Sequence, residues 1–142
     1  MKEKIREFIK NEGIVFPKEF VLELYTQIMK FGPLAGLIQA GSKKAGQKAG
    51  QIFKSYVQTN HDSIPDVIKE FIKETGFGEI DVRWEGENLV LEVKDSFLLK
   101  AHNKPEVALR PLVGAIEGFI SETLGKNTRS DVKGNVITVS VS

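Results

Sequence analysis

The chain has 142 residues, of which 41% are hydrophobic and 27% are charged, and its formal net charge is +1. This length and composition suit one folded domain with a buried core, and the near-neutral charge argues against a broad nucleic-acid-binding surface. The chain has no cysteine and two histidines, which excludes disulfides, thiolate metal ligands, cysteine nucleophiles and a histidine-rich metal site.

The first half of the sequence has the apolar spacing of helices. In the first ten residues Ile5, Phe8 and Ile9 share a stripe, and after Pro17 apolar residues recur at Phe20, Leu24 and Ile28. Proline and glycine then divide the region into further segments. The pattern predicts helices at residues 1–11, 17–32, 33–58 and 65–76.

The second half changes to alternation of apolar and polar residues. Ile80, Val82 and Trp84 alternate with charged residues, and the pattern repeats from residue 89 to 93 after a glycine-containing turn, which predicts a β-hairpin. A fifth helix is expected at 105–124, before Gly125, and a second hairpin at 128–133 and 136–141 around Gly134. We therefore expect an α+β fold, with about five helices packed on a small four-stranded antiparallel sheet made of two hairpins.

No linker, repeat or low-complexity segment divides the chain, so residues 1–142 are expected to form a single domain. Its first part, residues 1–30, holds the N-terminal helices. No apolar run reaches the roughly 18 residues that a membrane span requires. The first ten residues form a charged helical pattern without the apolar region of a signal peptide, so we expect a cytoplasmic protein.

The stretch GLIQAGSKKAGQKAG at residues 36–50 contains four glycines. It approaches the phosphate-binding pattern G-x-x-x-x-G-K-[ST], but Ser42 and Lys43 stand in the reverse order. A phosphate-binding loop also has to follow a strand, whereas the residues before Gly36 have helical spacing. We therefore expect a helix here and no nucleotide site.

Glycine inside a helix costs about 1 kcal/mol relative to alanine, so several glycines on one helix need compensation. Two explanations remain open: close approach of another helix, or room for a ligand, and both can hold at different glycines. The stretch RPLVGAIEGFISETLG carries a second patch of small residues. The two patches can pack on each other, or either can meet its copy in a dimer. The residues expected to pack closely are Gly41, Ala45, Gly46, Ala49, Gly50, Gly114 and Gly118.

Five features follow one another between residues 30 and 142: Gly41-x4-Gly46, Gly76-Phe77-Gly78, Asp95-Ser96, Gly114-x3-Gly118, and the sequence DVKGN at 131–135. In their order and spacing they resemble the 4-vinyl-reductase domain family, also called hydrocarbon-binding proteins. The resemblance implies that residues 31–142 form a small-molecule-binding domain.

The family resemblance implies a fold like that of the small subunits of the TRAPP tethering complex. Family members are usually small-molecule sensors or accessory domains, often homodimers, and some bind aromatic hydrocarbons in a buried apolar pocket. Metal-binding members carry cysteines where this chain has Leu109, Asn127, Ser130 and Thr138. We therefore expect no zinc, and the acylated cysteine of TRAPP subunits has no counterpart.

Some polar residues have the types found in hydrolases, notably Asp95, Ser96 and His102. The sequence lacks a G-x-S-x-G elbow, and Asp-Ser at a strand end is ordinary turn chemistry, so we expect no catalytic residues. Glu117 and Glu122 are expected on a solvated helix face, and Trp84 in the core.

The resemblance favours a pocket for a small apolar molecule between helices and sheet, although the same side chains would also suit a filled core. The expected lining residues are Leu34, Leu37, Ile38, Phe53, Val57, Phe71, Phe97, Leu98, Leu112, Ile116 and Phe119. The leading hypothesis is a non-enzymatic, dimeric ligand-binding domain without a cofactor, which acts on a partner protein. The alternatives are an interaction subunit with a filled core and, more weakly, an accessory protein of tetrapyrrole metabolism.

Overall fold

The computed structural model describes residues 1–32 and 34–142, and over these residues the chain forms six α-helices, one 3-10 helix and four strands. Five of the α-helices are longer than two turns, and the strands form two hairpins, so the predicted α+β fold class is confirmed. The elements are α1 (Lys2–Glu12), α2 (Lys18–Met29), α3 (Leu34–Phe53), α4 (Ile64–Glu74), β1 (Gly78–Glu85), β2 (Asn88–Ser96), η1 (Phe97–Ala101), α5 (Pro105–Ala108), α6 (Arg110–Leu124), β3 (Thr128–Lys133) and β4 (Val136–Val141).

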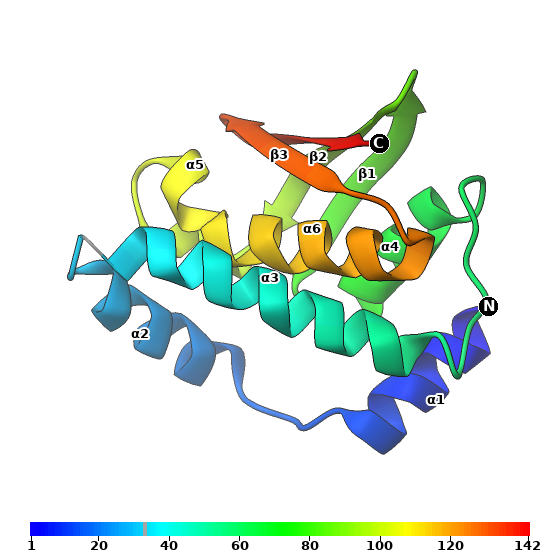
Figure 1. Cartoon of the computed structure of the whole chain (residues 1–142). Coiled ribbons are helices and arrows are strands. Elements are labelled where there is room, and N and C mark those ends of the chain that lie inside the picture. Colours follow the sequence, from blue (N-terminus) through cyan, green and yellow to red (C-terminus); the bar gives the residue numbers. More distant parts are fainter. Residues whose placement is uncertain (33) are drawn as a thin grey trace.

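The sheet is antiparallel throughout and has the strand order β1-β2-β4-β3. Its two central strands pair Leu89 with Val139 and Leu91 with Ile137, and all four side chains are buried. The helices cover one face of the sheet. In Figure 1, α6 lies beneath the sheet, α3 lies beneath α6, and α1 and α2 form the far side of the molecule.

Three expected helices have different bounds in the structure, and the second ends at Met29 and not at residue 32. The third ends at Phe53 and not near residue 58, and its expected start at Pro33 lies outside the described residues. The expected fifth helix is interrupted at Leu109 and becomes α5 and α6. Pro111 explains the break, because it has no N–H to donate to the carbonyl of Val107. That carbonyl instead accepts a hydrogen bond from the Tyr25 hydroxyl at 3.1 Å.

The core lies between the sheet and the helices and contains a cluster of aromatic rings. Phe53 is fully buried and contacts Phe8 and Phe119 edge to face, with ring centroids 5.1 Å apart in both pairs. Phe8 brings α1 into this cluster, and the Arg6 guanidinium fixes the same helix to Glu74 of α4 with two hydrogen bonds of 3.0 and 3.2 Å. Among the helices that the structure describes, none has the length and apolarity to cross a membrane.

Candidate functional site

Helices α3 and α6 form the most extensive contact between two elements in the described part of the chain. They run side by side and in the same direction (Figure 1). Both carry glycines four residues apart, Gly46 and Gly50 on α3 and Gly114 and Gly118 on α6. The two patches of small residues therefore meet each other within one chain.

The glycines of this seam lie directly against the backbone of the facing helix. A methyl group on Gly46 would overlap the carbonyl oxygen of Ala115, and one on Gly118 would overlap that of Lys43. At Gly50 it would lie 3.3 Å from the carbonyl oxygen of Phe119. Gly114 is equally close to α3. The absence of side chains thus lets the backbones touch, which offsets the low helix propensity of glycine with dispersion contacts.

A buried carboxylate, that of Glu117, joins this seam to the sheet. Its residue is 7% exposed, and its carboxylate oxygens lie 2.8 Å from Lys43 Nζ of α3 and within hydrogen-bond distance of the Ser130 hydroxyl of β3. The backbone carbonyl of Glu117 also accepts a hydrogen bond from Thr128 Oγ1 at 3.1 Å. The expectation that Glu117 lies on a solvated helix face is wrong. The close approach of α3 buries it, and the positive charge of Lys43 compensates its desolvation.

Beside this seam, α3 and α6 border an apolar cavity of about 340 Å³. Residues of α2, α4 and η1 complete its lining. We call this space the apolar cavity. It is lined by Val21, Tyr25, Ser42, Ala45, Gly46, Ala49, Ile68, Phe71, Ile72, Phe77, Leu98, Pro111, Leu112, Ala115, Ile116 and Phe119.

No charged side chain belongs to this lining, and its polar side chains are those of Tyr25 and Ser42. Tyr25 is 7% exposed, and burial raises the pKa of its hydroxyl to about 12, although the charge of Arg110 opposes the shift. The hydroxyl therefore stays protonated at neutral pH and holds α2 to the carbonyl of Val107. The cavity thus offers apolar surface and few hydrogen-bonding groups, as is usual of sites for small apolar molecules.

A second cavity of about 440 Å³ adjoins the first and lies under the connection between α1 and α2. The two share Val21, Phe71 and Phe77. The second cavity is more polar, because Lys18 and acidic side chains such as that of Glu74 belong to its lining. The apolar cavity is therefore the better candidate for a ligand without charge.

The structure brings some of the predicted pocket residues together and separates others. Five of them line the apolar cavity: Phe71, Leu98, Leu112, Ile116 and Phe119. Phe53 and Val57 are buried in the adjoining core, Ile38 is partly buried, and Phe97 lines the second cavity. Leu34 and Leu37 are exposed, and the prediction that they line the pocket is wrong. The apolar spacing of α3 continues past the end of the cavity, so spacing alone could not exclude them.

The residues predicted to pack closely also fall into two groups in the structure. Gly46, Gly50, Gly114 and Gly118 make the seam, whereas Ala45 and Ala49 face the apolar cavity. Gly41 was expected in the seam, but a methyl group there would meet open space among the described residues. Sequence reasoning missed the contribution of α2, which supplies Val21 and Tyr25 to the cavity.

Two of the hydrolase-type residues, Ser96 and His102, form hydrogen bonds with nearby backbone groups. Ser96 Oγ donates to the carbonyl of Phe77 at 2.7 Å and accepts from the amide of Leu98, which is capping chemistry at the start of η1. His102 Nδ1 accepts from the backbone amide of Lys104. Trp84 is partly buried and stacks on the ring of His61, with centroids 4.0 Å apart. The described residues contain no group of three side chains that could hold a metal ion.

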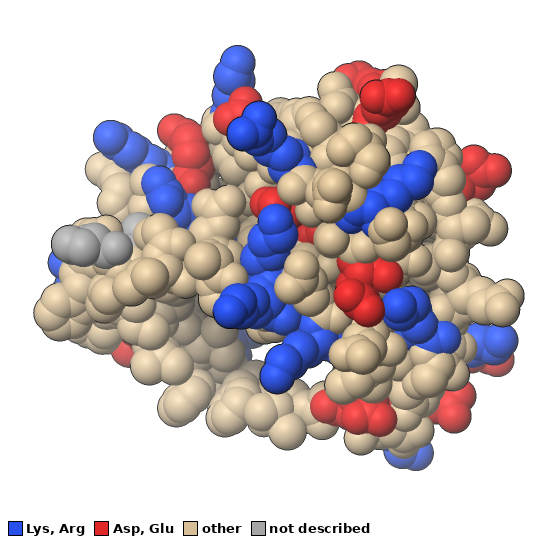
Figure 2. Space-filling view, in the orientation of Figure 1, with Lys and Arg blue, Asp and Glu red and all other residues tan. Residues whose placement is uncertain are grey.

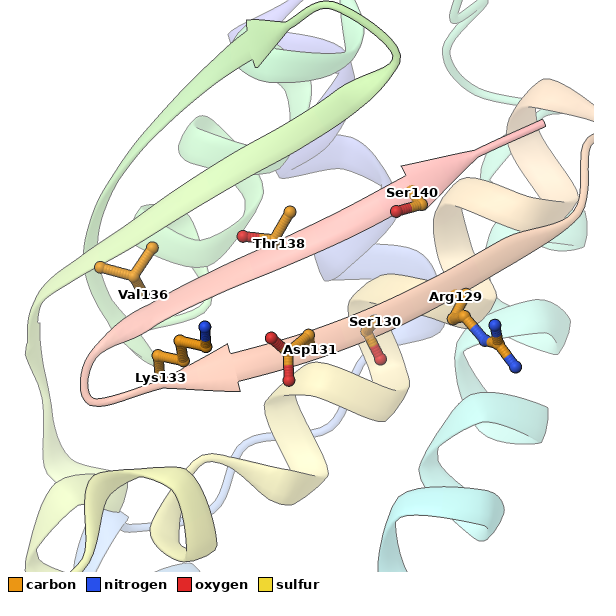
Figure 3. A pocket seen from close by; sticks show the side chains of 7 residues that line it. All are labelled: Arg129, Ser130, Asp131, Lys133, Val136, Thr138 and Ser140. Carbon is orange, nitrogen blue, oxygen red and sulfur yellow. The ribbon is translucent and has the colours of Figure 1, made fainter.

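The outer face of β3 and β4 forms an open hollow of about 360 Å³. Figure 3 shows Arg129, Asp131 and Lys133 along β3 beside Thr138 and Ser140 of β4. The charged side chains of β3 lie beside the hydroxyl groups of β4, as expected for the solvated face of an antiparallel sheet. This surface has no buried polar group that would select a ligand.

Comparison of the chain with known protein families and with curated proteins finds no match.

Proposed function

We propose that this chain is a non-catalytic binding domain that encloses a small, uncharged, apolar molecule in the apolar cavity and passes the signal to a partner protein. The observation that carries the proposal is the cavity itself. A volume of about 340 Å³ falls within the size range of small-molecule sites, and its lining contains no charged side chain.

The driving force would be removal of apolar surface from water, which contributes roughly 25 cal/mol per Å². The aromatic rings of Phe71 and Phe119, whose centroids lie 5.9 Å apart, would contact a ring-shaped ligand. The hydroxyl of Ser42 is the side-chain group best placed to bind a single polar atom, because the Tyr25 hydroxyl is already bonded to Val107. The ligand class is therefore a hydrocarbon with at most one polar group.

In this proposal, helix α2 transmits the signal of ligand binding. It covers the apolar cavity with Val21 and Tyr25, and its contacts with the rest of the chain are few compared with those between α3 and α6. A ligand that contacts α2 would favour one position of this helix and so shift a conformational equilibrium. The competing hypothesis, an interaction subunit with a filled core, has no use for such a cavity.

Binding of the uncharged fluorescent probe N-phenyl-1-naphthylamine tests the proposal. The probe should bind the purified protein in a saturable manner, with a rise in emission. The Ala49→Leu variant, which places a larger side chain in the cavity, should bind it about tenfold more weakly, since the added carbons occupy space that the probe needs. The matched control is Ala40→Leu, because Ala40 is exposed on the same helix and does not line the cavity.

Native mass spectrometry followed by solvent extraction complements this titration by detecting an apolar molecule that co-purifies with the chain. Probe binding that is equal in wild type, Ala49→Leu and Ala40→Leu would place the binding surface elsewhere and reject the proposal. Absence of saturable binding in a protein that carries no extractable molecule would reject it as well.

A further inference from the structure

The connection between α1 and α2 carries three consecutive apolar side chains that project into solvent. We call residues 13–17 the α1–α2 loop. Within it Ile14 is 80% exposed, Val15 97% and Phe16 51%. Single exposed apolar residues are common on protein surfaces, but a contiguous group marks a surface for another molecule. Phe20 of α2 extends the group, because it is 53% exposed and its ring stacks on that of Phe16 with centroids 4.9 Å apart.

The backbone of the α1–α2 loop is hydrogen-bonded at its two ends. The amide of Gly13 donates to the carbonyl of Ile9 at 2.9 Å, and the carbonyl of Pro17 accepts from the amide of Phe20 at 3.1 Å. Between these points, the amides of residues 14–16 donate to no backbone group of the described chain. The loop therefore suits surroundings that offer hydrogen-bond acceptors beside apolar surface.

The surface of a lipid bilayer offers both, and it fits this loop better than a folded protein does. Val15 is exposed on nearly all sides. Fluid lipid can surround such a side chain, whereas a flat protein surface contacts one side of it. The headgroup region of the bilayer also supplies acceptors for the free amides, which the hydrocarbon core does not.

The charges beside the loop select the kind of lipid. Lys10 and Lys18 are balanced by Glu12 and Glu19, so the surroundings of the loop carry no excess positive charge. Figure 2 shows lysine and arginine side chains gathered over α3, and uncharged residues along the lower edge, where Figure 1 places the loop. We therefore expect contact with zwitterionic lipid, without the attraction to anionic lipid that a basic patch would give.

The α1–α2 loop also borders the second cavity. Residues 14–16 belong to the lining of that cavity, although all three are exposed to solvent. Val21, Phe71 and Phe77 line both the second cavity and the apolar cavity. The three spaces therefore adjoin one another in the order of loop surface, second cavity and apolar cavity.

We infer that the α1–α2 loop contacts a lipid bilayer and that the apolar ligand passes between the bilayer and the apolar cavity by way of the second cavity. The passage of the ligand rests on the proposed function, whereas the membrane contact does not. An apolar molecule dissolves poorly in water and gathers in lipid, so direct passage avoids the aqueous step. Contact through a few apolar side chains is weak and reversible, which lets the chain leave the bilayer with its ligand.

A single fluorescent label tests the membrane contact. The chain has no cysteine, so Val15→Cys can be labelled at that position alone with the environment-sensitive fluorophore NBD. Its emission should rise and shift to shorter wavelength when vesicles of phosphatidylcholine are added, because the fluorophore leaves water. The matched control is Leu37→Cys, since Leu37 is 66% exposed on α3 and lines neither cavity. No change at Val15→Cys, or equal changes at both positions, would overturn the inference.

Flotation of the unlabelled full chain with the same vesicles measures the partition into lipid. Val15→Glu should lower this partition about tenfold, since a carboxylate has to leave water, while Leu37→Glu should behave like wild type. Circular dichroism checks that both variants are folded. Added phosphatidylglycerol or salt should change the partition little. Binding that requires phosphatidylglycerol and falls with salt would assign the contact to the lysines of α3 and overturn the inference, and so would a wild type that does not float.

The rate of ligand transfer tests the route. Protein loaded with N-phenyl-1-naphthylamine is mixed with phosphatidylcholine vesicles that carry a lipid-bound quencher, so that loss of emission reports transfer. The rate for wild type should rise with vesicle concentration, because transfer occurs during contact. The rate for Val15→Glu should not depend on vesicle concentration, as expected for a probe that crosses water. A wild-type rate that is independent of vesicle concentration would refute the route. Absence of probe binding in water would refute the proposed function and the route together, while flotation still decides the membrane contact.

Discussion

Where α3 faces α6, glycine lets two backbones touch, whereas where it faces α2, alanine borders the apolar cavity. Gly46 and Gly50 lie against Ala115 and Phe119, while Ala45 and Ala49, one position away, line the cavity. The difference comes from the opposite wall. Helix α6 carries its own glycines and can approach, but α2 meets the cavity with the bulkier Val21 and Tyr25 and stays at a distance.

The two sides also differ in how they are held. The seam between α3 and α6 is fixed by the ion pair of the buried Glu117 with the partly exposed Lys43, while α2 is held by a hydrogen bond from Tyr25 and by apolar contact. A small residue in a helix therefore has no single meaning. It brings a neighbour closer where the neighbour is also small, and it leaves room where the neighbour is large.

The largest expected effect is at the seam. Gly118→Ala should lower the free energy of unfolding by about 3 kcal/mol or more, because its methyl group would overlap the carbonyl oxygen of Lys43 and the backbones would have to separate. Urea denaturation followed by circular dichroism measures this change. A loss below about 1 kcal/mol would mean that the two helices are not in backbone contact.

Loss of the buried carboxylate should have the next largest effect. Glu117→Ala should lower the free energy of unfolding by about 2–3 kcal/mol, since it leaves Lys43 and Ser130 without their shared partner. The control on the same helix is Glu122→Ala, which removes a more exposed pair with Lys54 at 3.1 Å. That variant should lose less than about 1 kcal/mol. Equal losses would show that Glu117 is not buried in solution.

The hydrogen bond that holds α2 should contribute less and should depend on pH. Tyr25→Phe should cost about 1–2 kcal/mol at pH 7, because the carbonyl of Val107 loses its donor. Burial raises the pKa of Tyr25 to about 12, above the value of about 10 expected in the unfolded chain. The contribution of Tyr25 is therefore full below pH 10 and is lost as the pH rises through 12. Denaturation of both proteins from pH 7 to 12 should show their stabilities converging, and a constant difference would contradict the burial of the hydroxyl.

On the cavity side a larger residue should stabilise the chain. Ala49→Leu should raise the free energy of unfolding by about 1–2 kcal/mol, because the added carbons fill apolar space without displacing backbone. The same change at the exposed Ala40 should have almost no effect. Destabilisation by Ala49→Leu alone would indicate that α2 already fills this space.

The smallest expected effect is at Gly41, which does not lie against α6 as Gly46 does. Gly41→Ala should raise the free energy of unfolding by about 0.5–1 kcal/mol, since its methyl group would meet open space and alanine favours a helix. Thermal unfolding of Gly41→Ala and Gly46→Ala measures this contrast within one helix, since Gly46→Ala should destabilise the chain. A loss of stability in Gly41→Ala would place an unseen neighbour against this position.

The sequence was enough to predict the two hairpins and the long helices, because alternation and helical spacing are local properties. It also predicted that glycines such as Gly46 and Gly118 need compensation by a neighbour. The break at Leu109 was missed, although Pro111 indicated it, since proline is disfavoured inside a helix and enriched in its first turn.

Other features depend on contacts between distant parts of the chain, which the spacing of apolar residues does not reveal. Phe20 and Leu24 mark α2 in the sequence, yet it is mainly Tyr25 and Met29 that are buried, because this helix is apolar on two sides. The burial of Glu117 required the approach of α3 with Lys43 and the position of β3, which come from distant parts of the chain. The sequence pattern could not decide between burial and exposure for Phe20, Leu24 and Glu117, since each fits both environments.

Xenon binding to crystals of the chain tests most directly the claim that Ala45 and Ala49 of α3 border an apolar cavity. Xenon occupies dry apolar cavities and avoids close-packed or hydrated regions. The account predicts xenon density between α2, α3 and α6, next to Ala49 and Ile116, and none in the glycine seam. Ordered water at that place, or side chains of α2 closing it while xenon binds elsewhere in the core, would contradict the account.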